Sequence, residues 1–245
     1  MSRPESRARS FFRVLRSSWD LLKLELKVVS GGRTVVLGAV MLAYFAIIAV
    51  WAHLADDGWR TSAFFNSSVL LPTFVVAVVL SMGAIIGERD ARQLEVSFVS
   101  PSGRYRLWVF RLVSILLLVV AAAGVLSGLT WLVIDRDHLV GTTWLHAIPP
   151  LLATVSTTAF LSVLFKGASS AGLVVAVVAG FSGFLHLGGQ PMTFDLWFNP
   201  FLIGNVTDEA AWFRTMVNNR TVLLVVSGLA TTFLLGLLQK RERLT

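Results

Sequence analysis

Few residues of this chain have types that could carry out chemistry, and none has a catalytic spacing. The sequence has no cysteine, so thiolate metal sites, disulfides and thiol nucleophiles are excluded. It has no Gly-Lys pair of a phosphate-binding P-loop, and its four histidines lack the HExxH spacing of zinc proteases. The GFSG stretch at 180–183 does not meet the GxSxG pattern of a nucleophile elbow. We therefore expect no catalytic residue and no bound cofactor or metal.

Charge is concentrated in segment 87–106, which reads GERDARQLEVSFVSPSGRYR. Its seven charged residues are Glu88, Arg89, Asp90, Arg92, Glu95, Arg104 and Arg106. In a helix over residues 88–99, Ala91, Leu94 and Phe98 would share one face because they are three and four apart. An exposed pair such as Glu88–Arg92 stabilises a helix by only about 0.3–0.5 kcal/mol. So much charge beside an apolar stripe favours contact with another protein over a solvated loop.

The elements that must position this segment are apolar helices. Hydrophobic residues make up 55% of the 245 residues, and the mean hydropathy is +0.74. Charged residues make up 14%, against about 25% in soluble domains. A helix needs about 20 apolar residues to cross a bilayer, and six uncharged runs are long enough. They are 34–55, 61–87, 112–134, 139–165, 167–194 and 221–239. We expect an all-α, polytopic membrane protein in which residues 34–245 form one six-span domain, with a tight hairpin at KGASS between the fourth and fifth spans.

The distribution of Lys and Arg predicts the orientation of these spans. Eight precede the first span, five lie between the second and third counting Arg111, one follows the fourth and three are in the tail. The alternate loops together hold four. Cytoplasmic loops carry the excess of Lys and Arg, so both termini should be cytoplasmic in a multi-pass protein of the cell membrane. This explains the net charge of +7 without a nucleic-acid partner.

No Asp, Glu, Lys or Arg falls within the expected spans. Proton- or sodium-driven transporters usually place such residues at membrane depth. If this chain moves a substrate, we expect the energy to come from a partner, through a pathway between two such subunits.

Residues 1–33 are predicted to form a basic amphipathic helix on the inner membrane surface. An apolar stripe recurs every three or four positions, at Phe12, Leu15, Trp19, Leu22, Leu26 and Val29. Lys and Arg occupy other faces, which is typical of a helix in the membrane interface. A soluble helix packed on a partner is the alternative. Gly31 and Gly32 would end the helix before the first span.

The segment 188–220 is long and apolar for a loop. Trp197, Phe198, Phe201 and Trp212 are of a type that settles at membrane interfaces. Gly, Pro and Asn residues interrupt any single helix through it. We expect a partly re-entrant pair of short helices on the outer side, or else a plain surface loop.

The order of these features resembles the type 2 exporter permeases of ATP-binding-cassette (ABC) transporters, over nearly the whole chain. GERDARQLEVSFVSPSGRYRLWVFRL is similar to the family's acidic–basic cluster, Leu-Glu pair (Leu94–Glu95), Ser-Pro turn (Ser100–Pro101) and basic start of the third span. NRTVLLVVSGLATTFLLGLLQKRERL looks like its last span and basic tail. One departure is Gln93, where many members have a Gly-Thr or Gly-Ser pair.

The resemblance implies a non-enzymatic permease subunit that pairs with a second copy or homologue. Two cytoplasmic P-loop ATPase subunits would bind ATP and Mg and hydrolyse the ATP. Segment 87–106 would be the coupling segment, with the coupling helix over residues 88–99. The residues implied to contact the ATPase are Glu88, Arg89, Arg92, Leu94, Glu95, Phe98, Ser100 and Pro101. Family members export lipids, glycan carriers, drugs or peptides, and nothing here selects among these. A membrane-embedded enzyme and a non-transporting scaffold subunit are the alternatives.

Overall fold

The computed structural model describes residues 18–54, 64–84, 104–187, 194–201 and 208–239. These residues form an all-α structure, as the composition predicts. Its helices are residues 18–29, α2 (Gly32–Leu54), η2 (Phe65–Leu70) continuing into α3 (Leu71–Met82), α6 (Arg104–Leu129) continuing into η3 (Thr130–Ile134), α7 (Val140–Leu164), α8 (Ala168–Leu187) and α9 (Glu209–Gln239). Within the described part of the chain, six helices are long and apolar enough to cross a membrane. The expectation of six spans is therefore confirmed.

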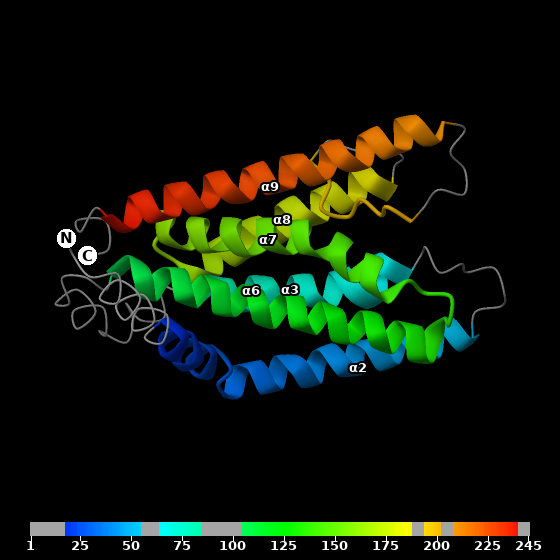
Figure 1. Ribbon diagram of the computed structural model, residues 1–245, viewed down its shortest axis with the longest axis horizontal. Coiled ribbons are helices and arrows are strands. Elements are labelled where there is room, and N and C mark those ends of the chain that lie inside the picture. Colours follow the sequence, from blue (N-terminus) through cyan, green and yellow to red (C-terminus); the bar gives the residue numbers. More distant parts are fainter. Residues whose placement is uncertain (1–17, 55–63, 85–103, 188–193, 202–207, 240–245) are drawn as a thin grey trace, which may run out of the picture.

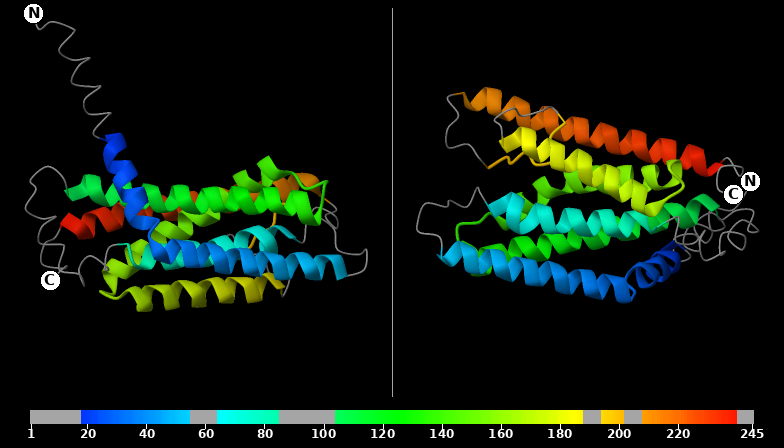
Figure 2. Two further views of the ribbon diagram at one scale, coloured as in Figure 1. Left: turned by 90° about the horizontal axis from the view of Figure 1, so that it is seen from below. Right: turned by 180° about the vertical axis from the view of Figure 1, so that it is seen from behind.

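The six long helices lie side by side in one bundle (Figure 1). Helix α7 is central because it packs against α3, α6, α8 and α9, whereas α2 and α9 lie at opposite edges. The short helix 18–29 leaves the line of α2 and runs across the end of the bundle (Figure 2). The break lies at Ser30 and Gly31, where the sequence predicts it.

The core of the bundle consists of apolar side chains from all six long helices. Among the largest fully buried ones are Phe65, Ile115, Leu126, Leu151 and Leu234. Large apolar side chains also cover the outer surface of the bundle; α8, for example, exposes Leu173, Val177, Phe181 and Phe184. Such a surface suits lipid or a second subunit rather than water. The protein is thus a polytopic membrane protein whose helices have both a packed side and an apolar outer side.

Hydroxyl groups link helices where the core contains polar residues. Thr130 Oγ1 donates to Ser68 Oγ at 3.1 Å, which joins η3 to η2. The hydroxyls of Ser156 on α7 and Ser227 on α9 are 2.8 Å apart. Interhelical hydrogen bonds of this kind hold membrane helices together where the hydrophobic effect between them is weak.

Helices α7 and α8 are joined by the tight turn that the sequence predicts. Lys166 has a φ of 52°, in the left-handed region, and the N–H of Gly167 donates to the carbonyl of Ser162 at 3.2 Å. This bonding satisfies carbonyls at the end of α7 and reverses the chain within three residues. The turn places α8 directly beside α7.

The last helix differs from the sequence expectation. It begins at Glu209 rather than near Thr221, so residues 209–220 belong to α9 and not to an outer loop. Asp208 caps this helix, because its Oδ1 accepts a hydrogen bond from the N–H of Ala211 at 3.0 Å. The described part of the preceding segment, residues 194–201, forms turns and not short helices.

Candidate functional site

A buried ion pair joins three elements at the end of the bundle where helix 18–29 lies. Arg111 of α6 donates from Nε to Glu25 Oε2 at 2.8 Å, and from Nη1 to the carbonyl of Ala84 at 3.0 Å. The side chains of Arg111 and Glu25 are only 10% and 4% exposed. The Arg111 guanidinium also lies 5.8 Å from the centre of the Trp108 ring. It is the only ion pair that joins residues of the described ranges, and we call Glu25, Ala84 and Arg111 the junction.

The junction holds the two ends of the charged segment that the sequence singles out. Ala84 is the last described residue before that segment, and α6 begins at Arg104, near the end of the segment. Arg111 lies two turns into α6 and donates to the carbonyl of Ala84. The ends of the second and third spans are therefore fixed to each other and to helix 18–29.

The sequence pattern does not reveal this pair. It treats Arg111 as a boundary charge before the third span, whereas the structure includes it in a candidate span, Trp108–Ile134. Glu25 and Val29 are one turn apart on the side of the helix that meets the bundle, and Val29 packs against the core. The available signal in the sequence was an acidic residue, Glu25, one helical turn before Val29, an apolar residue that contacts the core. Its partner lies 86 positions away and has no signal in a local pattern.

The residues implied to contact an ATPase lie outside the described ranges. They are Glu88, Arg89, Arg92, Leu94, Glu95, Phe98, Ser100 and Pro101. The same holds for Phe12 and Leu15 of the predicted membrane-surface helix. Of the remaining residues in that stripe, Trp19 is exposed, while Leu22 and Leu26 are half-buried. The described part of the stripe thus lies partly toward the bundle and partly outward.

At the opposite end of the bundle, the irregular segment 194–201 is fixed by side chains from three helices. The carbonyl of Asp195 accepts a hydrogen bond from Asn219 Nδ2 at 2.9 Å, and that of Trp197 accepts one from Asn66 Nδ2 at 2.7 Å. The indole Nε1 of Trp197 donates to a carbonyl of α8, that of Ala179, at 2.7 Å. Irregular backbone at membrane depth must be satisfied inside the protein. These contacts do so and close this end of the bundle.

Arg220 of α9 belongs to the cluster of polar groups around segment 194–201 and corrects a second expectation. It lies in the candidate span Glu209–Leu238 and is buried, so the spans are not free of charge. Its guanidinium donates to the Phe198 carbonyl and to Asn219 Oδ1, both at 3.2 Å. The carboxylate of Asp195 accepts from Ser182 Oγ at 3.0 Å. These hydrogen bonds go to backbone and neighbouring side chains, which is a structural arrangement, whereas Asn66 Oδ1 and Arg220 Nε are buried without a hydrogen-bond partner among the described residues.

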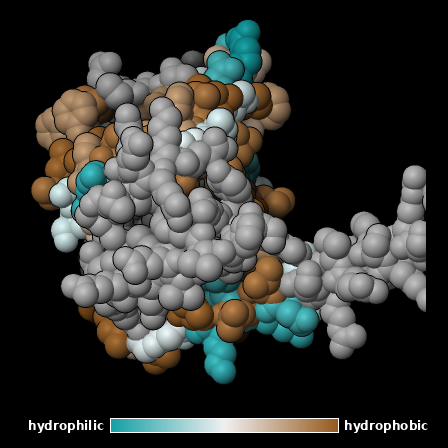
Figure 3. Space-filling view, turned by 90° about the vertical axis from the view of Figure 1, so that its left-hand side faces the viewer, coloured by the Kyte–Doolittle hydropathy of each residue, from teal (hydrophilic) through white to brown (hydrophobic). Residues whose placement is uncertain are grey.

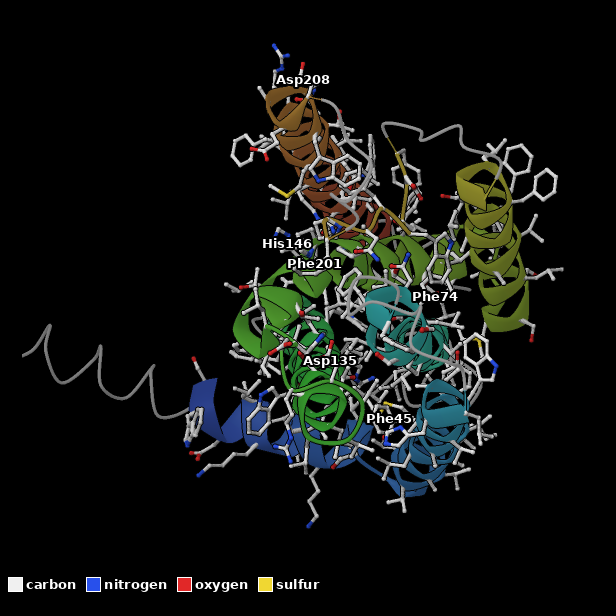
Figure 4. All side chains as sticks on the ribbon, turned by 90° about the vertical axis from the view of Figure 1, so that its right-hand side faces the viewer. Phe45, Phe74, Asp135, His146, Phe201 and Asp208 are labelled. Atoms are coloured by element: carbon white, nitrogen blue, oxygen red, sulfur yellow. The ribbon has the colours of Figure 1, made fainter. Side chains whose placement is uncertain are left out.

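Aromatic rings also lie at this end of the bundle. Figure 4 views this end and shows His146 beside Phe201. Their ring centres are 5.5 Å apart in an edge-to-face arrangement, and the centre of the Phe65 ring lies at the same distance from that of Phe201. Among the described residues, no group of three or more His, Asp or Glu side chains could hold a metal ion.

A small cavity of about 50 Å³ lies between α7 and α8, and Phe194 and Leu196 form part of its wall. Sites for drug-sized ligands usually enclose about 300–1,000 Å³. The cavity is therefore too small to be a candidate substrate site, and the junction is the arrangement best suited to a functional role.

Comparison with known proteins adds no family to this description. No protein-family model matches the chain, and no curated protein matches it. The function must therefore be argued from the membrane fold, the charged segment and the junction.

Proposed function

We propose that this chain is the transmembrane subunit of an ABC exporter. In this role it pairs with a second permease copy or homologue, and the pair encloses the substrate pathway. Separate cytoplasmic P-loop ATPase subunits bind ATP and Mg and contact segment 87–106. Six candidate spans, the sequence resemblance and the junction support this proposal.

The observation that carries the proposal is the position of Arg111. It bonds at once to Ala84 at the end of the second span and to Glu25 on helix 18–29. A displacement of the segment between Ala84 and Arg104 would therefore act on the second span, the third span and helix 18–29 together. A loop that only connects two spans would not need both of its ends fixed to a third element by a buried charge. A subunit that receives movement from an ATPase does need such a connection.

The first test is partner binding. We expect the chain to co-purify with a P-loop ATPase encoded in a neighbouring reading frame, and to stimulate or respond to its ATP hydrolysis. The purified chain alone should hydrolyse no ATP. Robust hydrolysis by the chain alone would contradict the proposal and favour a membrane-embedded enzyme. Co-purification with a partner whose ATP hydrolysis does not respond to the chain, together with an absence of transport, would favour a scaffold subunit.

The second test addresses the coupling segment with matched substitutions. Leu94→Asp and Phe98→Asp place a charge on the predicted apolar face, while Val96→Asp places the same charge on the opposite face of that helix. We expect the first two to insert normally but to lose ATPase-subunit binding or the coupling of hydrolysis to transport. The Val96 variant should behave like the parent. Normal assembly and transport by both Leu94→Asp and Phe98→Asp would show that the segment is only a loop.

A further inference from the structure

Helix 18–29 has one side attached to the bundle and the other side exposed. Glu25 and Val29 lie on the attached side. Lys23 and Lys27 are both exposed. Their positions, two residues before and two after Glu25, place them on the opposite side of the helix. The junction therefore determines which side of this helix faces outward.

Pairing with Arg111 removes the acidic charge of Glu25 from the outward side. The charged residues exposed on the described helix are Asp20, Lys23 and Lys27, which gives this side a positive balance. Apolar side chains border it: Trp19 is 56% exposed, Leu24 is 54% exposed and Val28 is 57% exposed. A basic strip between exposed apolar residues is typical of helices that lie in the membrane interface.

Trp19 and Lys23 form a pair on this side. The ammonium of Lys23 lies 5.4 Å from the centre of the Trp19 ring. Indole rings settle at the level of the lipid headgroups, and a lysine stem can lie along apolar surface while its charge reaches the headgroups. Figure 3 views this end of the molecule and shows hydrophilic side chains projecting beyond the apolar rim of the bundle. Both residues of the pair therefore fit the same depth in a bilayer.

From this arrangement we infer that the outward side of helix 18–29, with Trp19, Lys23 and Lys27, binds the anionic phospholipid headgroups of the inner leaflet. The Glu25–Arg111 ion pair fixes the rotation of the helix that presents this side to the lipid. A basic residue near an anionic membrane surface contributes about fivefold in affinity. This inference depends on insertion into a bilayer and not on coupling to an ATPase, so it can fail or hold independently of the proposed function.

The absence of cysteine from the sequence allows a single reporter to be introduced. Leu24→Cys in the full chain, labelled with an environment-sensitive fluorophore, is placed in nanodiscs of phosphatidylcholine or of phosphatidylcholine with phosphatidylglycerol. We expect a blue shift of emission only with the anionic lipid. The shift should diminish with added salt, because the Debye length falls from about 10 Å at 0.1 M to about 3 Å at 1 M. A Leu173→Cys reporter on the exposed side of α8 is the control and should show no such shift.

Two sets of variants assign the effect to residues. Lys23→Gln with Lys27→Gln should abolish the lipid-dependent shift, whereas Lys166→Gln, at an exposed lysine in the α7–α8 turn, should leave it intact. Replacing the ion pair by Glu25→Leu with Arg111→Met should also reduce the shift, since the rotation of the helix is then no longer fixed.

Three results would overturn the inference. The first is equal emission in the two lipid compositions, and the second is an unchanged shift in the double lysine variant. The third is a shift that appears in phosphatidylcholine discs only when polyglutamate is added, which would assign this side to an acidic protein. An unchanged shift in the Glu25–Arg111 variant would show that the ion pair does not set the rotation.

Discussion

Arg111 and Glu25 are 86 positions apart in the sequence, yet the Nε of one lies 2.8 Å from the Oε2 of the other inside the protein. Because Arg111 also binds the Ala84 carbonyl, this pair joins helix 18–29 to the ends of two spans. A buried ion pair gains little over an apolar pair of similar volume, but removing one partner leaves an uncompensated charge. The pair is therefore a point at which single substitutions should have large effects.

We predict that Arg111→Met lowers the free energy of unfolding by about 3–5 kcal/mol, because the Glu25 carboxylate is left buried without its partner. The double variant Glu25→Leu with Arg111→Met should recover much of this loss. Thermal unfolding of the purified chain in detergent measures both. A double variant as unstable as Arg111→Met would contradict the explanation.

The structure of segment 194–201 should depend on Asn219, whose Nδ2 donates to the Asp195 carbonyl at 2.9 Å. Asn219→Leu removes this donor, and an unsatisfied buried group costs about 1–3 kcal/mol. The adjacent Asn218 is exposed, so Asn218→Leu is a matched control and should change stability little. The comparison is made by unfolding in detergent. Equal effects of the two substitutions would argue against the role of this hydrogen bond.

Stability should fall below neutral pH because of His138, which is buried in the turn between η3 and α7. Its Nε2 lies 3.2 Å from Ser127 Oγ. Burial lowers the pKa of His138 below the usual 6.5, and the charge of Asp135 opposes this only in part. His138 therefore binds a proton more readily in the unfolded chain than in the folded protein. Stability is full above about pH 6.5 and is lost as the pH falls through the lower native pKa.

Unfolding temperatures measured between about pH 8 and pH 5 test this expectation, in the range where histidines titrate. His138→Gln should have a flatter pH dependence than the parent. His53→Gln, at an exposed position near the end of α2, should retain the parent's slope. A parental slope in His138→Gln would assign the pH effect to another group.

The orientation predicted from Lys and Arg can be tested with reporter fusions. Fusions after Asp57, Asp137 and Asp208 should report the outer side, and fusions after Ser102, Gly167 and Thr245 the cytoplasm. Alkaline phosphatase and a fluorescent protein give opposite readouts for the two sides. A cytoplasmic result at Asp208 would contradict both the sixth span and the family resemblance.

The start of α9 illustrates a signal that the sequence contains but that the charge pattern obscured. Asp208 followed by Glu209 is a helix-start signature, and Asp208 does cap the helix. The charged residues Arg214 and Arg220 suggested a loop as far as the uncharged run. A helix can extend beyond its apolar part, and Arg220 is accommodated by the Phe198 carbonyl.

Features that depend on local composition could be predicted from the sequence alone. The lengths of the apolar runs predicted six helices, Gly31 predicted the break before α2, and the residues around Lys166 predicted the tight turn between α7 and α8. Each of these follows from hydropathy or from backbone preference within a few residues.

The polar groups that meet inside the protein could be identified only from the packing of its helices. Two of these contacts join residues far apart in the chain: the ion pair of Glu25 with Arg111 and the hydrogen bond from Asn66 to Trp197. The burial of Arg220 likewise depends on a contact with another segment, at the Phe198 carbonyl. A hydropathy pattern treats each charged residue as if it faced only lipid or water, with no partner from another helix. A buried charge or amide is stable only when a partner is supplied by another element, and packing of the helices determines that partner.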